Sequence, residues 1–233
     1  EALTGSVGNL VATESGTKVY KIFRKVWFVN FWLVSFASAG LFVLVNPFIS
    51  LWIGDSYLLE KKVVFIICLN LYMRFIRNTF LTFIDTYGLF KQVKPKCIAE
   101  AFINLTVSLL MVGPLKMGIY GVLLGTFISN ITTNFWYEPY LLFKKFNVRL
   151  RQYFMLFAEY FSLTIISAGV MSWICNDLIS ISGWAGFIVK VIVTCLGINI
   201  FYIAVFIKTD EFKYFWEILK ARIMRLKPNG EKK

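Results

Sequence analysis

The sequence predicts an all-α membrane protein, a polytopic bundle of about six transmembrane helices. Of its 233 residues, 58% are hydrophobic and 18% are aromatic, whereas soluble domains contain about 45 to 50% apolar residues. Several uninterrupted apolar segments reach the length of about 20 residues that is needed to cross about 30 Å of hydrocarbon. These apolar segments require lipid around them rather than water.

Six apolar segments are predicted to span the membrane. Aromatic residues such as Trp52, Trp136 and Trp184 mark many of their ends, as expected for side chains anchored at the membrane–water interface. Gly121 and Gly125 form a GxxxG spacing, which is typical of closely packed membrane helices. The predicted spans are residues 30–53, 63–87, 97–113, 118–140, 154–175 and 184–207, so that residues 30–207 form one transmembrane region.

The distribution of lysine and arginine predicts the orientation of these spans. Basic residues gather in alternate connections, at 18–25, 91–96, 144–151 and from 208 onward. Connections rich in Lys and Arg face the cytoplasm. Both ends of the chain, including the basic tail 208–233, are therefore expected on the cytoplasmic side.

Two cytoplasmic segments, 18–27 and 212–226, carry apolar residues at helical spacing opposite charged ones. This pattern is typical of helices that lie on a membrane surface rather than cross it. Residues 2–13 resemble the end of an earlier helix, so that residues 1–29 are interpreted as a helix end followed by an amphipathic linker. The chain is accordingly expected to be the C-terminal part of a longer protein.

The composition argues against several classes of function. The chain contains no histidine, the residue that most often serves as a general base or a zinc ligand. The net charge of +12 is dispersed over short connections rather than gathered on one surface, so that nucleic acid is not an expected partner. No paired catalytic carboxylates or phosphate-binding glycine loop occur, and neither an enzyme nor a bound cofactor is predicted.

Arg74 and Arg77 are the most informative polar residues, because both lie near the middle of the second span. An arginine at that depth costs about 2.5 to 3.5 kcal/mol when it faces lipid. Asn70, Asn78 and Asp85 share the same helical face. The stripe predicts either a cavity that binds an anionic group such as a diphosphate, or a buried ion pair with a carboxylate on another helix.

Weaker polar stripes occur in the third and fourth spans, at Glu100 and Asn104 and at Asn130 and Asn134. These residues either line the same cavity or form hydrogen bonds between helices. A transporter would use a carboxylate to couple transport to Na+ or H+. The candidates for this role are Asp85, Glu100 and Glu159.

Three segments carry a family resemblance: GSVGNLVATES, KVYKIFRKVWFVNFW and NPFISLWIGDSYLL. Over residues 2–207 the chain resembles the Wzx-type oligosaccharide flippases of the multidrug/oligosaccharidyl-lipid/polysaccharide exporter superfamily. The resemblance implies a MATE-like fold of two lobes around a cavity. The first four predicted spans would then complete the second lobe, and the last two would be the two additional helices of the family.

The function implied by the resemblance is transport of polyprenyl-diphosphate-linked oligosaccharide across the bacterial cytoplasmic membrane for cell-surface polysaccharide biosynthesis. Lipid-linked oligosaccharide, membrane lipids and a polysaccharide polymerase or assembly proteins would be the partners. A drug or cation antiporter of the same superfamily is an alternative, but such a protein would need acidic rather than basic cavity residues. A membrane polysaccharide polymerase or assembly subunit is a further alternative, although the predicted outer loops are short for a polymerase.

Overall fold

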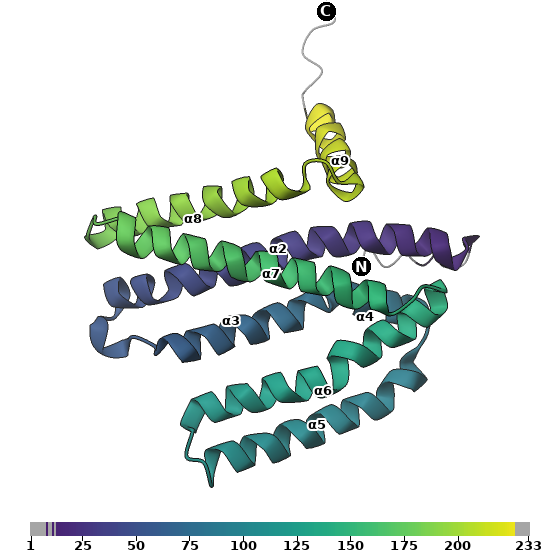
Figure 1. The fold of residues 1–233 in the computed structure, drawn as a ribbon, viewed down its shortest axis with the longest axis horizontal. Coiled ribbons are helices and arrows are strands. Elements are labelled where there is room, and N and C mark those ends of the chain that lie inside the picture. The colour runs from purple at the N-terminus through teal and green to yellow at the C-terminus, as the bar shows by residue number, and fades with distance from the viewer. Residues whose placement is uncertain (1–7, 9–10, 12, 227–233) are drawn as a thin grey trace, which may run out of the picture.

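The computed structural model describes residues 8, 11 and 13–226, and every regular element in this part of the chain is a helix (Figure 1). Successive long helices run in opposite directions and are joined by short turns. The elements are α2 (Gly16–Trp52), η1 (Asp55–Tyr57), α3 (Lys61–Ile76), α4 (Asn78–Thr86), α5 (Phe90–Val112), α6 (Gly118–Phe146), α7 (Arg151–Trp173), η2 (Ile174–Leu178), α8 (Gly183–Phe206) and α9 (Asp210–Leu226). The prediction of an all-α bundle is confirmed.

Five helical segments in the described part of the chain are long and apolar enough to cross a membrane: Gly16–Trp52, Lys61–Thr86, Phe90–Val112, Arg151–Leu178 and Gly183–Phe206. They correspond to five of the six predicted spans. The remaining predicted span lies in α6, whose 29 residues also suffice in length. It carries the polar residues Asn130, Asn134 and Glu138.

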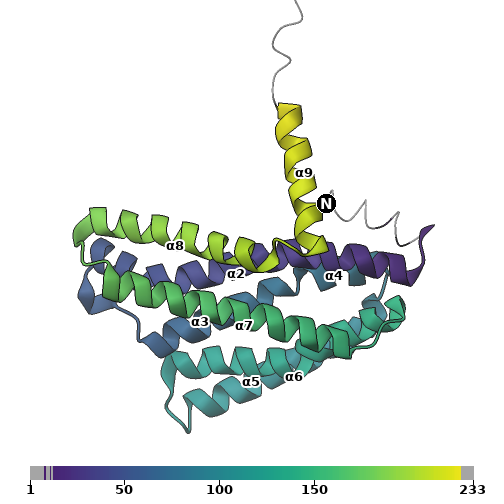
Figure 2. The ribbon, with the colours of Figure 1, turned by 45° about the horizontal axis from the view of Figure 1, so that its top comes forward.

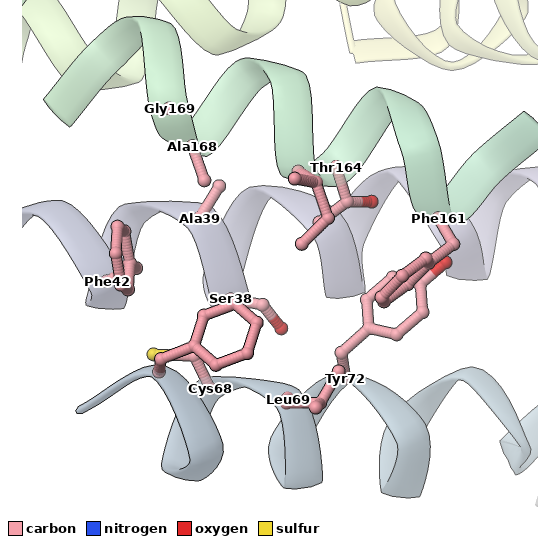
Figure 3. Close-up of a pocket in the computed structure, with 12 residues that line it drawn as sticks. Ser38, Ala39, Phe42, Cys68, Leu69, Tyr72, Phe161, Thr164, Ala168 and Gly169 are labelled. Carbon is pink, nitrogen blue, oxygen red and sulfur yellow. The ribbon is translucent and has the colours of Figure 1, made fainter. Parts of the chain in front are cut away.

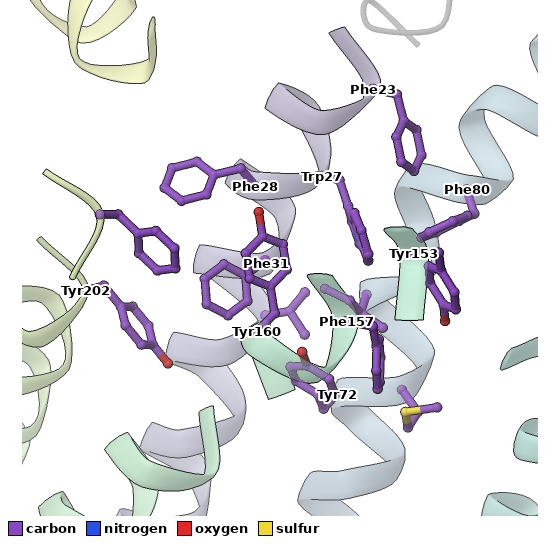
Figure 4. Close-up of a cluster of buried hydrophobic side chains, with 14 of the residues drawn as sticks. Phe23, Trp27, Phe28, Phe31, Tyr72, Phe80, Tyr153, Phe157, Tyr160 and Tyr202 are labelled. Carbon is purple, nitrogen blue, oxygen red and sulfur yellow. The ribbon is translucent and has the colours of Figure 1, made fainter. Parts of the chain in front are cut away.

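The α2 helix is the centre of the bundle and contacts α3, α7, α8 and α9. Its aromatic side chains meet those of the surrounding helices in one buried cluster (Figure 4). The Trp27 ring stacks on Tyr153 at a centroid distance of 5.7 Å, and Phe31 stacks on Tyr160 at 4.0 Å. Aromatic pairs of this kind contribute about 0.5 to 1.5 kcal/mol each beyond burial alone, and here they join helices distant in sequence.

Hydrogen bonds between hydroxyl groups also join these helices at the edge of the aromatic cluster. Ser35 Oγ lies 2.6 Å from Thr164 Oγ1, and Ser167 Oγ lies 3.0 Å from the Tyr202 hydroxyl. These bonds link α2 to α7 and α7 to α8. In a membrane, where lipid offers no hydrogen-bond partner, such bonds contribute about 0.6 kcal/mol each.

The basic segment 18–27 does not form a separate surface helix, contrary to the sequence-based prediction. It is the beginning of α2, which continues without interruption to Trp52. Val19, Phe23 and Trp27 are fully buried, because the helices that follow provide an aromatic surface on which this apolar stripe packs. The predicted helix end in residues 2–13 falls mainly on residues outside the described part of the chain.

The α9 helix crosses the end of the bundle at a steep angle to the other helices (Figure 2). Its first turns are fixed to α2 by an Arg24–Glu211 ion pair of 2.6 Å and by stacking of Phe212 on Trp32. Residues 210–226 thus form a helix, as their apolar spacing predicts, and the position of this helix on a membrane surface stays a prediction. Residues 227–233 lie outside the described chain.

The α5 and α6 helices form a closely packed hairpin through the predicted GxxxG spacing. A Cβ atom placed on Gly121 would lie 2.9 Å from Met111 Cβ, and one placed on Gly125 would lie 3.0 Å from the Ser108 backbone nitrogen. Both distances are too short for a side chain. The glycines therefore allow the two backbones to approach each other.

Replacing Gly125 by Leu should destabilise the hairpin by about 1 to 3 kcal/mol, because the added atoms must displace the α5 backbone. The measurement is the free energy of unfolding of the purified protein in mixed detergent micelles. Gly169→Leu is the matched control, since a Cβ at Gly169 meets no atom within 4 Å. Equal stability of the two variants would contradict this account of the hairpin.

Candidate functional site

A buried ion-pair network joins α6 to two other helical segments. The Arg77 guanidinium donates to both carboxylate oxygens of Glu138, from Nε at 2.9 Å and from Nη2 at 2.6 Å. Lys96 on α5 donates from Nζ to Oε1 of the same carboxylate at 2.7 Å. The Glu138 side chain is fully buried and pairs with two cations, of which Lys96 is 5% and Arg77 is 16% exposed.

Glu100 and Asn134 extend this network. Lys96 Nζ lies 3.7 Å from Glu100, and Asn134 Nδ2 donates to Glu100 Oε1 at 2.6 Å. Two cations and two carboxylates give a formally neutral group. The space beside Arg77, Asn134 and Glu138 measures about 10 Å3, which is about the volume that one water requires. The network is therefore closed to a substrate in this conformation.

The helix break at Arg77 allows its side chain to reach α6. The second predicted span is divided there into α3 and α4. Asn30 on α2 donates its amide to the carbonyl oxygens of Phe75 at 2.9 Å and Ile76 at 3.1 Å. Because backbone carbonyls must be satisfied inside a membrane protein, Asn30 stabilises the interrupted helix.

Arg74 and Arg77 were predicted to lie at a similar depth on one helical face, but they differ in exposure and in pairing. Its side chain is exposed, and no ion pair in the described part of the chain includes it. The guanidinium carbon lies 5.9 Å from the centre of the neighbouring Phe75 ring. The structure thus separates the two arginines: Arg77 forms the ion pair that was the alternative prediction, and Arg74 remains on the surface.

The other residues of the predicted stripe also lie in different surroundings. Asn70 donates from Nδ2 to the Leu123 backbone oxygen at 2.9 Å and so joins α3 to α6. Asn78 and Asp85 are exposed on α4. Asn78 follows Arg74 by four residues across the break at Arg77, and Asp85 follows Asn78 by seven residues on the same face of α4.

The polar residues predicted in the remaining spans act mainly between helices. Asn104 donates to Thr126 Oγ1 at 3.2 Å and to Ser129 Oγ at 3.3 Å. Asn130 is buried, and its Oδ1 has no hydrogen-bond partner among the described residues. Glu159 is exposed on α7, apart from the network.

Sequence reasoning missed Lys96 and Glu138, the two residues that complete the network. Lys96 was grouped with the basic residues of a connection, although α5 begins at Phe90 and includes it. A signal was present in both cases. Lys96 and Glu100 are four residues apart, as helical ion pairs are, and Glu138 is a carboxylate within a predicted span.

A cavity of about 190 Å3 lies between α2, α3 and α7 (Figure 3). Its walls are almost entirely apolar and include Phe42, Phe65 and Phe161. None of the predicted site residues lines it. An anionic head group would find no charged partner in this cavity.

Comparison with known proteins gives no assignment. No family model, no curated protein and no solved structure matches the chain. The arguments for function therefore rest on the sequence and on the geometry described above.

Glu138→Ala should lower the free energy of unfolding by about 3 to 5 kcal/mol, because the buried Lys96 and the partly buried Arg77 would lose their shared carboxylate. Unfolding in mixed micelles measures this loss. Glu159→Ala removes the same kind of side chain from an exposed position and should change the stability little. A Glu138→Ala protein as stable as the Glu159→Ala control would show that the network does not stabilise the fold.

Proposed function

We propose that this protein is a membrane transporter that moves a polyprenyl-diphosphate-linked oligosaccharide across the bacterial cytoplasmic membrane for cell-surface polysaccharide assembly. The assignment to a membrane protein is supported by the all-helical bundle, which has five segments able to cross a membrane. The finer proposal rests on one observation, the exposed Arg74, which forms no ion pair with any described residue. The proposal assigns the basic end of the bundle and the C-terminal tail to the cytoplasmic side.

Arg74 lies near the middle of the segment Lys61–Thr86, about 20 Å along the helix axis from Lys61 and about 18 Å from Thr86. Snorkelling to either surface does not easily cover that distance. Exposure to lipid would cost about 2.5 to 3.5 kcal/mol. This face therefore favours a water-filled cavity or an anionic partner.

A diphosphate suits this position chemically. Guanidinium groups bind phosphate oxygens through two parallel hydrogen bonds and stay charged at every physiological pH. Asn78 is exposed one turn from Arg74 and offers an amide to a phosphate or a sugar hydroxyl. Arg77 is not proposed as a direct ligand, because Glu138 already neutralises it.

The assignment of coupling carboxylates also changes. Glu100 pairs with Lys96 and accepts from Asn134, so it is not a free site for Na+ or H+. Asp85 and Glu159 are exposed and remain the candidates for ion coupling. Asp85 follows Arg74 by 11 residues, about 16 Å along the helix axis, so a coupling ion at Asp85 would bind apart from the substrate group at Arg74.

The test is complementation of a bacterial strain that lacks its own polysaccharide flippase, using the complete gene that encodes this chain. Arg74→Ala should reduce surface polymer about 10- to 100-fold at matched membrane abundance, because a charge-assisted contact to phosphate contributes about 1.5 to 3 kcal/mol. Arg74→Lys should give an intermediate level. Lipid-linked oligosaccharide should accumulate on the cytoplasmic side.

Lys116→Ala is the matched control, since it removes a basic residue from an exposed turn outside the helices. Full polymer from Arg74→Ala would refute the proposed site while keeping the transporter. No polymer from the wild-type gene with several lipid-linked oligosaccharides supplied would refute the flippase assignment. Resistance to cationic drugs conferred by the same gene would favour the antiporter instead.

A further inference from the structure

In three helical segments the backbone hydrogen-bond pattern is interrupted beside the ion-pair network. The α3–α4 segment is broken at Arg77 itself. Pro95 directly precedes Lys96 inside α5, and Pro139 directly follows Glu138 inside α6. A proline inside a helix removes one backbone hydrogen bond and bends the helix there. Each chain segment that contributes a charged group to the network is therefore flexible beside that group.

The α6 helix is packed very differently on the two sides of the ion-pair network. Beyond Pro139, the last turns of α6 enter the aromatic core, where Leu142, Phe143 and Phe146 are at most 1% exposed. On the other side, segment 96–138 projects as the α5–α6 hairpin, here named the arm (Figure 1). Lys96 is the only buried residue of α5 within the described chain.

The arm is stiff within itself, and it meets the rest of the bundle along α3 and, near its base, through Phe135, whose ring centroid lies 4.8 Å from that of Phe157. Gly121 and Gly125 hold its two helices in close contact. The Asn70 side-chain amide donates a hydrogen bond to the Leu123 backbone oxygen of the arm at 2.9 Å. A hydrogen bond between membrane helices contributes about 0.6 kcal/mol to stability. Motion should therefore occur at the base of the arm rather than within it.

We propose that the arm pivots at the level of Arg77, Pro95 and Pro139, and that Glu138 sets its angle by holding Arg77 and Lys96 together. With the carboxylate ionised, its pair with Arg77 fixes the base of the arm to α3–α4, and its pair with Lys96 joins the two helices of the arm at that base. Removal of the negative charge leaves Arg77 and Lys96 facing each other, with Glu100 and the Tyr153 hydroxyl as the other titratable groups near Glu138. The two cations then repel, and the arm opens.

Spin-label distances in lipid nanodiscs test this pivot in the full chain. One pair joins Lys116→Cys at the tip of the arm to Ser180→Cys in the turn before α8, with the exposed Cys97 replaced by Ser. The tip lies about 30 Å from Glu138 along α6, so a rotation of about 20° moves it by about 10 Å. Glu138→Gln, which keeps the size and removes the charge, should add a population shifted by about that distance.

Two controls separate the pivot from general loss of structure. A second label pair, Tyr57→Cys with Ser180→Cys, lies outside the arm and should keep one distance in Glu138→Gln. Glu159→Gln should leave both pairs as in the wild type. Adding Pro95→Ala and Pro139→Ala to Glu138→Gln restores the missing backbone donors and should return the arm to a single distance.

An unchanged arm distance in Glu138→Gln would overturn the proposal. So would broadening of both label pairs together, since Glu138 would then hold the whole bundle rather than the angle of the arm. Persistence of the second population after both prolines are replaced would also overturn it, because the pivot would lie elsewhere.

Discussion

The burial of the Glu138 carboxylate is the constraint on which the arrangement of these helices depends. An ionised carboxylate removed from water is stable only when cations and hydrogen bonds replace its hydration. Arg77 and Lys96 supply them from two different segments, so that α3–α4, α5 and α6 must meet at one level. The interruption of the second span and the position of Lys96 inside α5 both follow from this requirement.

The aromatic core provides the rigid reference for that meeting point. Phe23 and Trp27 on α2 contact Phe80 on α4, and Phe146 at the end of α6 packs on Phe23 at 5.2 Å. These contacts fix the ends of α4 and α6 without any charged group. The polar network then determines how the rest of α5 and α6 projects from the core.

Local sequence patterns were sufficient for the helices but not for the site. Apolar length and the Gly121–Gly125 spacing predicted the bundle and the close α5–α6 packing, because each of these patterns is contained within a single helix. Arg77 and Glu138 are 61 positions apart, and nothing local distinguishes the paired Arg77 from the exposed Arg74. The start of α2 was mispredicted for the same reason, since its burial depends on α4 and α6.

The central claim is that Arg77 and Glu138 interact directly inside the bundle, and a double-mutant cycle measures this most directly. Unfolding free energies of the wild type, Arg77→Met, Glu138→Gln and the double variant give the coupling between the two side chains. The account predicts a coupling of about 1.5 kcal/mol or more. Additive effects of the two substitutions would contradict it, because independent residues would then hold these helices together.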